Sequence, residues 1–200
     1  KKSTKIFILA ALSIGLMYIC FGFTTTSIAL VIFGTIHIIS KSIHEESYAI
    51  MLHNASKKTD VNKNIGLSLT FMNIGWMIGP LLTAFILYKA DFSIAFFIAA
   101  LSIILGAYIA YSLRIHEKLV IKKKLDKNIK KNFIDFFKHK ELRKGYIMST
   151  VEHMWWTIVY IYLPLSLIPR GIQSQDIALI LAFIVIPLVL FDYPMSMISR

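Results

Sequence analysis

The sequence predicts an all-α fold, an integral membrane helical bundle, and three observations predict it. The 200 residues are 56% hydrophobic and only 16% charged, whereas a soluble domain carries about 25% charged residues. Six apolar stretches come close to or exceed the roughly 20 residues that a helix needs to cross the hydrocarbon core. A single polar segment, residues 114–144, holds twelve of the 22 Lys and Arg residues, as expected of a cytoplasmic loop.

The apolar stretches are expected to be helices, because a chain in lipid has to satisfy every backbone polar group internally. The expected spans are residues 6–23, 28–52, 65–88, 92–113, 145–168 and 177–198. With the chain start in the cytoplasm, nineteen basic residues lie inside and two, Lys89 and Arg170, lie outside; Lys41 falls within a span. This asymmetry predicts that both ends of the chain are cytoplasmic. The chain begins without Met and ends directly after an apolar run, so we interpret it as a fragment.

The basic segment contains its own helical pattern. Apolar residues recur at helical spacing and alternate with lysines, the apolar ones being Ile129, Phe133, Phe136 and Phe137. This pattern predicts an amphipathic helix on the inner membrane surface, close to anionic lipid head groups. A helix that binds a specific partner is the alternative. The same clustering between apolar spans excludes nucleic acid as the reason for the net charge of +11.

The second span carries the strongest functional signal, because ionisable groups inside a membrane are costly and rare. At helical spacing His37, Lys41, His44 and Tyr48 share one face, with Glu45 beside it. We interpret this face as the lining of a water-filled cavity that binds a polar substrate or relays a proton. Lys41 would pair with Glu45, four residues on, or with an acid on another helix. The alternative is that these groups reach the membrane interface and lock helices together.

Two other spans carry candidate residues. In the fifth span Glu152, Trp156 and Tyr160 are candidates for the substrate or proton pathway, because aromatic rings can stack on a flat or cationic ligand. Glu152 pairing with a basic group of the loop is the alternative. In the last span we interpret Asp192 as a helix-end residue or a partner for a loop lysine. No cofactor or metal site is expected: the position of the second histidine of a His-Glu zinc motif is Tyr48.

The third span contains Gly66, Gly75 and Gly79-Pro80, small residues that allow close helix packing and a proline that can bend the helix. With these glycines and the long basic loop, the layout resembles the third to eighth helices of a major facilitator superfamily transporter, which has two bundles of six helices. The resemblance implies that residues 1–113 end the N-terminal bundle, 114–144 join the bundles and 145–200 begin the C-terminal bundle. The glycine-proline set resembles an antiporter signature, although Thr83-Ala84 replace its final glycines.

The resemblance implies a secondary active transporter that moves a small solute by alternating access. We expect proton-coupled export, with protons as the coupling ion, in the cell (inner) membrane. An importing symporter or uniporter for a sugar, peptide or nutrient is the first alternative. A membrane-embedded enzyme or a non-transporting scaffold or sensor is the second. An enzyme is not expected, because the sequence contains neither a nucleophile–base pair nor a complete metal set.

Overall fold

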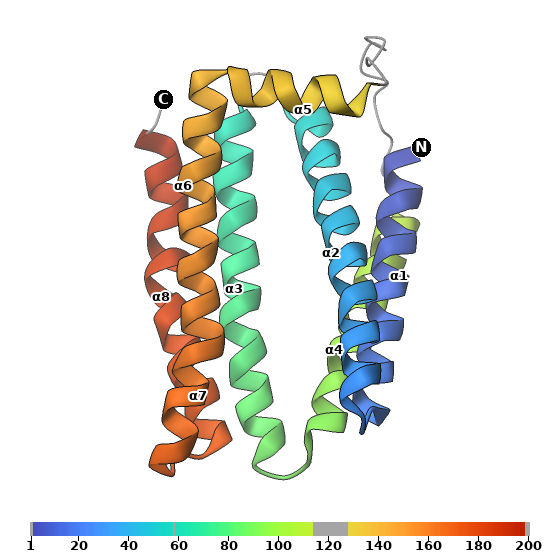
Figure 1. Ribbon diagram of the computed structural model, residues 1–200, viewed down its shortest axis with the longest axis vertical. Coiled ribbons are helices and arrows are strands. Elements are labelled where there is room, and N and C mark those ends of the chain that lie inside the picture. The colour runs from blue at the N-terminus through green and yellow to red at the C-terminus, as the bar shows by residue number, and fades with distance from the viewer. Residues whose placement is uncertain (1, 58, 114–127, 199–200) are drawn as a thin grey trace. The chain divides into compact units, whose positions relative to one another are not determined.

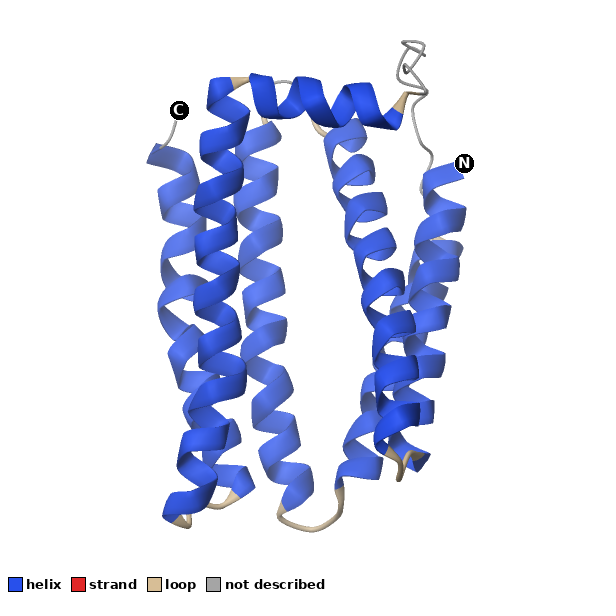
Figure 2. Cartoon of the chain, in the orientation of Figure 1, coloured by secondary structure: helices blue, strands red, loops and turns tan. Residues whose placement is uncertain are grey.

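The computed structural model describes residues 2–57, 59–113 and 128–198, and within them it contains helices and no strands (Figures 1 and 2). This confirms the predicted all-α fold. The part of the loop at residues 114–127 lies outside the described residues. The helices, in chain order, are α1 (Lys2–Phe23), α2 (Ser27–Ala55), α3 (Val61–Leu87), α4 (Phe92–Ser112), α5 (Ile129–Lys138), α6 (Lys140–Thr157), the π-helical turn η1 (Ile158–Tyr162), α7 (Leu163–Leu167), the 3₁₀ turn η2 (Ile168–Arg170) and α8 (Ser174–Ile198).

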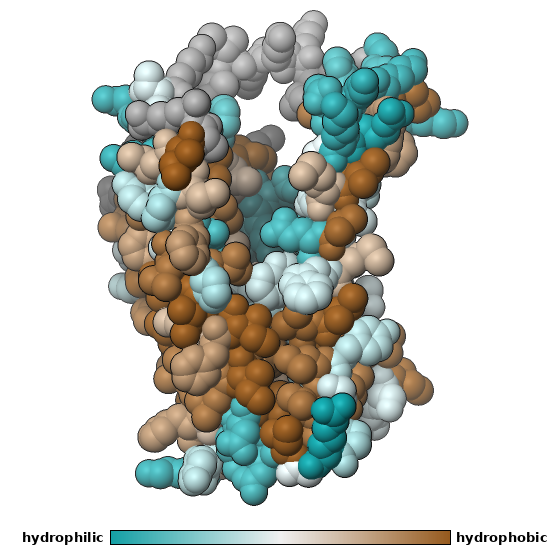
Figure 3. Space-filling view, turned by 90° about the vertical axis from the view of Figure 1, so that its left-hand side faces the viewer, coloured by the Kyte–Doolittle hydropathy of each residue, from teal (hydrophilic) through white to brown (hydrophobic). Residues whose placement is uncertain are grey.

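Five of these helices are long and apolar enough to cross a membrane, counting only the part of the chain that the structure describes. They are α1, α2, α3, α4 and α8. Figure 3 shows one face of the molecule with hydrophobic side chains over most of its middle and hydrophilic ones gathered toward both ends. This distribution is typical of a bundle whose middle contacts lipid, and the chain is an integral membrane protein.

The fifth predicted span, residues 145–168, is helical but not one regular helix, so the predicted count of six is not confirmed. Its first part, α6, begins at Lys140 among polar residues, and the π-helical turn η1 follows α6. Within η1 the amide of Leu163 donates to the carbonyl of Ile158, five residues back. Pro164 explains the widened turn, because proline lacks an N–H and its ring crowds the carbonyl four residues before it. Pro164 was visible in the sequence, but the widened turn before it was not predicted.

Side-chain caps begin the helices that follow short turns. The Thr26 hydroxyl accepts from the Ala29 amide at the start of α2, and the Asp91 carboxylate accepts from the Ser93 and Ile94 amides at the start of α4. Such caps satisfy amides that have no partner in the first helical turn. They fix where α2 and α4 begin.

The chain divides into two compact units. One contains α1 to α4 together with α8 from Ala178 onward, and the other contains α5 to η2. In the first unit α1 packs closely on α2 and α4; a Cβ added at Gly15 would lie 2.9 Å from Ile104 Cγ1. Small residues are buried on both helices, such as Ala11 of α1 and Ala107 of α4, and small residues allow helices to approach closely. The assignment of residues 1–113 and 145–200 to different bundles stays a prediction.

Candidate functional site

The polar segment of the second predicted span lies at the centre of α2. This helix has 29 residues, from Ser27 to Ala55. Lys41 therefore has 14 helical residues on either side, or roughly 21 Å of helix at about 1.5 Å per residue. A charged side chain thus occupies the midpoint of a helix that is long and apolar enough to cross a membrane.

The predicted polar face of α2 is divided between covered and open positions. Around the helix axis from buried Ser40, His44 and His37 follow at about 40° and 60°, Lys41 at about 100° and Glu45 at about 140°. Exposure increases in the same order: Ser40 is 7% exposed, both histidines are half-buried, and Lys41 and Glu45 are exposed. One edge of the face therefore packs inside the first unit, and the other edge is open.

The covered edge packs on α1. The ring of His44 stacks on Phe7 of α1 at 4.2 Å between centroids, and the ring of His37 lies 5.1 Å from Tyr18. The Ser40 hydroxyl shares a hydrogen bond with the Ser13 hydroxyl at 2.8 Å. These contacts support packing roles for both histidines. The Nε2 atom of His37 is buried and has no hydrogen-bond partner among the described residues.

The open edge carries an ion pair. Lys41 Nζ lies 3.6 Å from Glu45 Oε1, and the two side chains are 51% and 60% exposed. This is the same-helix pair that the sequence offered as one of two alternatives. On the same side of α2 the Tyr48 hydroxyl shares a 2.6 Å hydrogen bond with Ser68 Oγ of α3. The open edge therefore lies on the side of α2 that faces α3.

The candidates of the fifth predicted span lie in the second unit. The rings of Trp156 and Tyr160 lie 5.6 Å apart between centroids, one on the last turn of α6 and the other within η1. Glu152 is exposed, one turn before Trp156. The structure brings the two aromatic rings together, while a shared pathway with Lys41 stays a prediction.

A polar contact between α3 and α8 was missed by sequence reasoning. The Asn73 side-chain amide donates a short hydrogen bond to Asp192 Oδ2, and Asn73 is only 6% exposed. The structure therefore gives Asp192 a buried amide as a partner, which the sequence did not predict. The expected helix-end role or loop-lysine partner for Asp192 stays a prediction. The signal available in the sequence was Asn73, a polar residue at the centre of an apolar span. Its partner is 119 residues away, too far for any local pattern to show.

The glycine set of α3 has two kinds of environment. A Cβ added at Gly66 would overlap the Ser196 side chain of α8, so a larger residue at this position would disturb that contact. A Cβ added at Gly75 or Gly79 would meet no atom of the described chain within 4 Å. The helix continues through Pro80 to Leu87. A close partner for the middle of this helix therefore stays a prediction.

Comparison with known proteins gives one match. The family model of the Major Facilitator Superfamily matches residues 1–199. Neither a curated protein nor a solved structure matches the chain. Among the described residues, no group of three or more His, Cys, Asp or Glu residues is placed to hold a metal ion.

Proposed function

The chain belongs to the Major Facilitator Superfamily, a family of secondary transporters, and we propose that it exports a small solute in exchange for protons by alternating access. In this mechanism two bundles rock about a site near the middle of the membrane. We assign to the pathway the exposed ion pair of α2 and the pair of aromatic rings of the second unit, and these groups suit a flat or cationic solute.

The observation that carries this proposal is the exposed Lys41–Glu45 pair at the midpoint of α2. A charged residue at the centre of a membrane helix costs about 2.5–3.5 kcal/mol even by the lower scales. The described helices leave the pair open, so its surroundings are lipid, water or another part of the protein. Water in a transport pathway removes most of this cost, and lipid does not.

The ion pair supplies a coupling step. When the pathway is empty, Lys41 and Glu45 neutralise each other at 3.6 Å. A proton that binds Glu45 removes its charge and frees Lys41 to interact with water or with an anionic group of the opposite bundle. The difference in free energy between the inward-open and outward-open states then depends on whether Glu45 carries a proton. This dependence is the requirement for coupling transport to protons.

The aromatic pair of the second unit would supply part of the solute site. Trp156 and Tyr160 already lie ring beside ring, so a flat or cationic solute can stack on their outer surface. Glu152, one turn earlier and exposed, would attract a cation. The glycine-proline set of α3, from Gly66 to Pro80, supports exchange over symport by its resemblance to the antiporter signature.

The experiment follows lumen pH in proteoliposomes that contain the full-length protein and a trapped pH-sensitive dye. Solutes are added outside one at a time: the flat aromatic cation ethidium, a hexose and a dipeptide. An exchanger carries solute in and protons out, so a substrate raises the lumen pH. A proton symporter lowers it, and a uniporter admits labelled solute with no pH change.

The expected result is a rise in lumen pH with ethidium and no response in protein-free vesicles. A fall in lumen pH with the hexose or the dipeptide would replace export by nutrient import. Absence of flux for a wide solute panel, in protein that is demonstrably folded, would leave a non-transporting role.

A further inference from the structure

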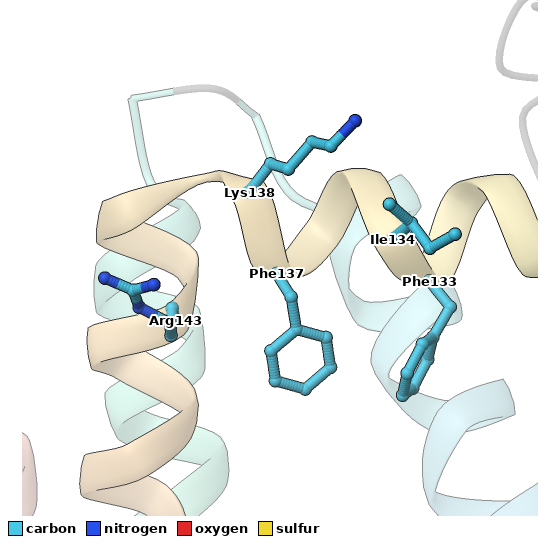
Figure 4. Close-up of a pocket in the computed structure, with 5 residues that line it drawn as sticks. All are labelled: Phe133, Ile134, Phe137, Lys138 and Arg143. Carbon is cyan, nitrogen blue, oxygen red and sulfur yellow. The ribbon is translucent and has the colours of Figure 1, made fainter.

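The second unit contains a hollow at the elbow between α5 and α6. Its lining residues are Phe133, Ile134, Phe137, Lys138 and Arg143. Figure 4 shows the rings of Phe133 and Phe137 projecting from α5 on the side along which α6 runs, while Lys138 extends from the opposite side of α5. The hollow therefore has an apolar wall, and the cationic side chains of Lys138 and Arg143 lie at its margin.

The apolar wall is already ordered within this unit. The Phe133 and Phe137 rings lie 4.9 Å apart between centroids, and the Phe137 ring lies 5.7 Å from Tyr146 of α6 in an edge-to-face arrangement. Phe133 is still 65% exposed. An exposed apolar face of this kind is typical of a surface that contacts lipid or an apolar partner.

The charges of the elbow favour an anionic occupant. The Arg143 guanidinium has no ion pair with any acidic residue in the described part of the chain, and the Lys138 ammonium lies 3.9 Å from Asp135, at the limit of an ion pair. A guanidinium forms strong paired hydrogen bonds with phosphate oxygens. A molecule with both an aliphatic chain and a phosphate matches the apolar wall of the hollow and the cationic side chains at its margin.

We infer that the α5–α6 elbow is a binding site for one anionic phospholipid. Its acyl chains lie along the Phe133 and Phe137 rings in the direction of α6, and its phosphate binds Arg143, with Lys138 supporting the negative charge of the head group. Binding in this way holds α5 flat on the membrane surface. The site does not depend on the solute or on the direction of transport.

Native mass spectrometry of the full-length protein released from lipid nanodiscs tests the site. Phosphatidylglycerol and phosphatidylcholine with identical acyl chains are the two probes. The expected result is that one phosphatidylglycerol molecule stays bound, with an affinity about tenfold above that of phosphatidylcholine, as expected of a charge-assisted contact. Equal retention of the two lipids would overturn the inference without any variant. It would leave the proposed function untouched.

Variants then locate the lipid. Arg143→Gln should lower the retention of phosphatidylglycerol by about tenfold, and Phe137→Ala should lower the retention of both lipids. Arg170→Gln, at the other end of the same unit and also exposed, is the matched control and should change neither. Equal retention in the Arg143 and Arg170 variants would place the lipid elsewhere and contradict the assignment. Loss of retained lipid on addition of inorganic phosphate alone would indicate a free-phosphate site.

Discussion

Replacing Asn73 with Leu removes the amide that donates to Asp192 Oδ2 while keeping the number and branching of the side-chain heavy atoms. Asn73 is 6% exposed, so water cannot replace the lost donor. The carboxylate of Asp192 would lose this partner within an apolar helix. We expect the variant to be less stable than the parent protein.

The magnitude follows from two limits. Hydrogen bonds between membrane helices contribute about 0.6 kcal/mol on average and about 1.7 kcal/mol at most in double-mutant cycles. Hydrogen bonds to charged groups contribute about 1.5–3 kcal/mol. The Asn73–Asp192 hydrogen bond joins two membrane helices and is made to a carboxylate, so both ranges apply to it. The expected coupling energy lies near their overlap, at about 1–2 kcal/mol.

A double-mutant cycle measures this energy. The four proteins are the full-length parent, Asn73→Leu, Asp192→Leu and the double variant, each unfolded reversibly with SDS in mixed micelles. Asn62→Leu, an exposed asparagine on the same helix, is the matched control and should show no coupling to Asp192→Leu. A coupling energy below about 0.3 kcal/mol, within the additivity expected of distant sites, would refute the contact as a stabilising link between α3 and α8.

Two further changes test the packing of single elements. Gly66→Leu should destabilise the protein by about 1–3 kcal/mol, the usual cost of overpacking, because the new side chain would overlap Ser196. Gly75→Leu should change the stability by less than about 0.5 kcal/mol, because no described atom lies near that position. SDS unfolding measures both variants, and equal loss of stability in the two would contradict the prediction. Pro164→Ala restores a backbone donor and should convert the π-helical turn Ile158–Tyr162 to regular α-helix, seen as changed Cα chemical shifts in solid-state NMR; unchanged shifts would show that proline is not the cause.

Sequence patterns were sufficient for the elements that hydrophobicity alone determines. The apolar runs predicted the helices α1 to α4 and α8 to within a few residues, and the lysine-interleaved phenylalanines predicted α5. The break in the fifth predicted span was not predicted. A hydropathy count takes no account of Pro164, whose effect depends on the backbone geometry of the turn before it.

The candidate site could be predicted only in part. Helical spacing placed His37 and Lys41 on one face, and it offered the Lys41–Glu45 pair that the structure contains. It could not show that the face is divided, because the rotation of α2 against α1 depends on contacts between the helices, such as Phe7 with His44 and Ser13 with Ser40. Contacts between distant segments, such as Asn73 with Asp192, leave no local pattern at all.

The central claim is that the ion pair of α2 couples solute movement to protons, and lumen pH in vesicles containing Lys41→Ala tests it most directly. Lys89→Ala is the matched control, since Lys89 lies in the turn after α3, with its ammonium over the ring of Phe85 at 5.6 Å. The account predicts that the Lys41 variant still exchanges labelled for unlabelled solute but no longer changes lumen pH, while the Lys89 variant retains both activities. A lumen pH signal of full size in the Lys41 variant would contradict the account.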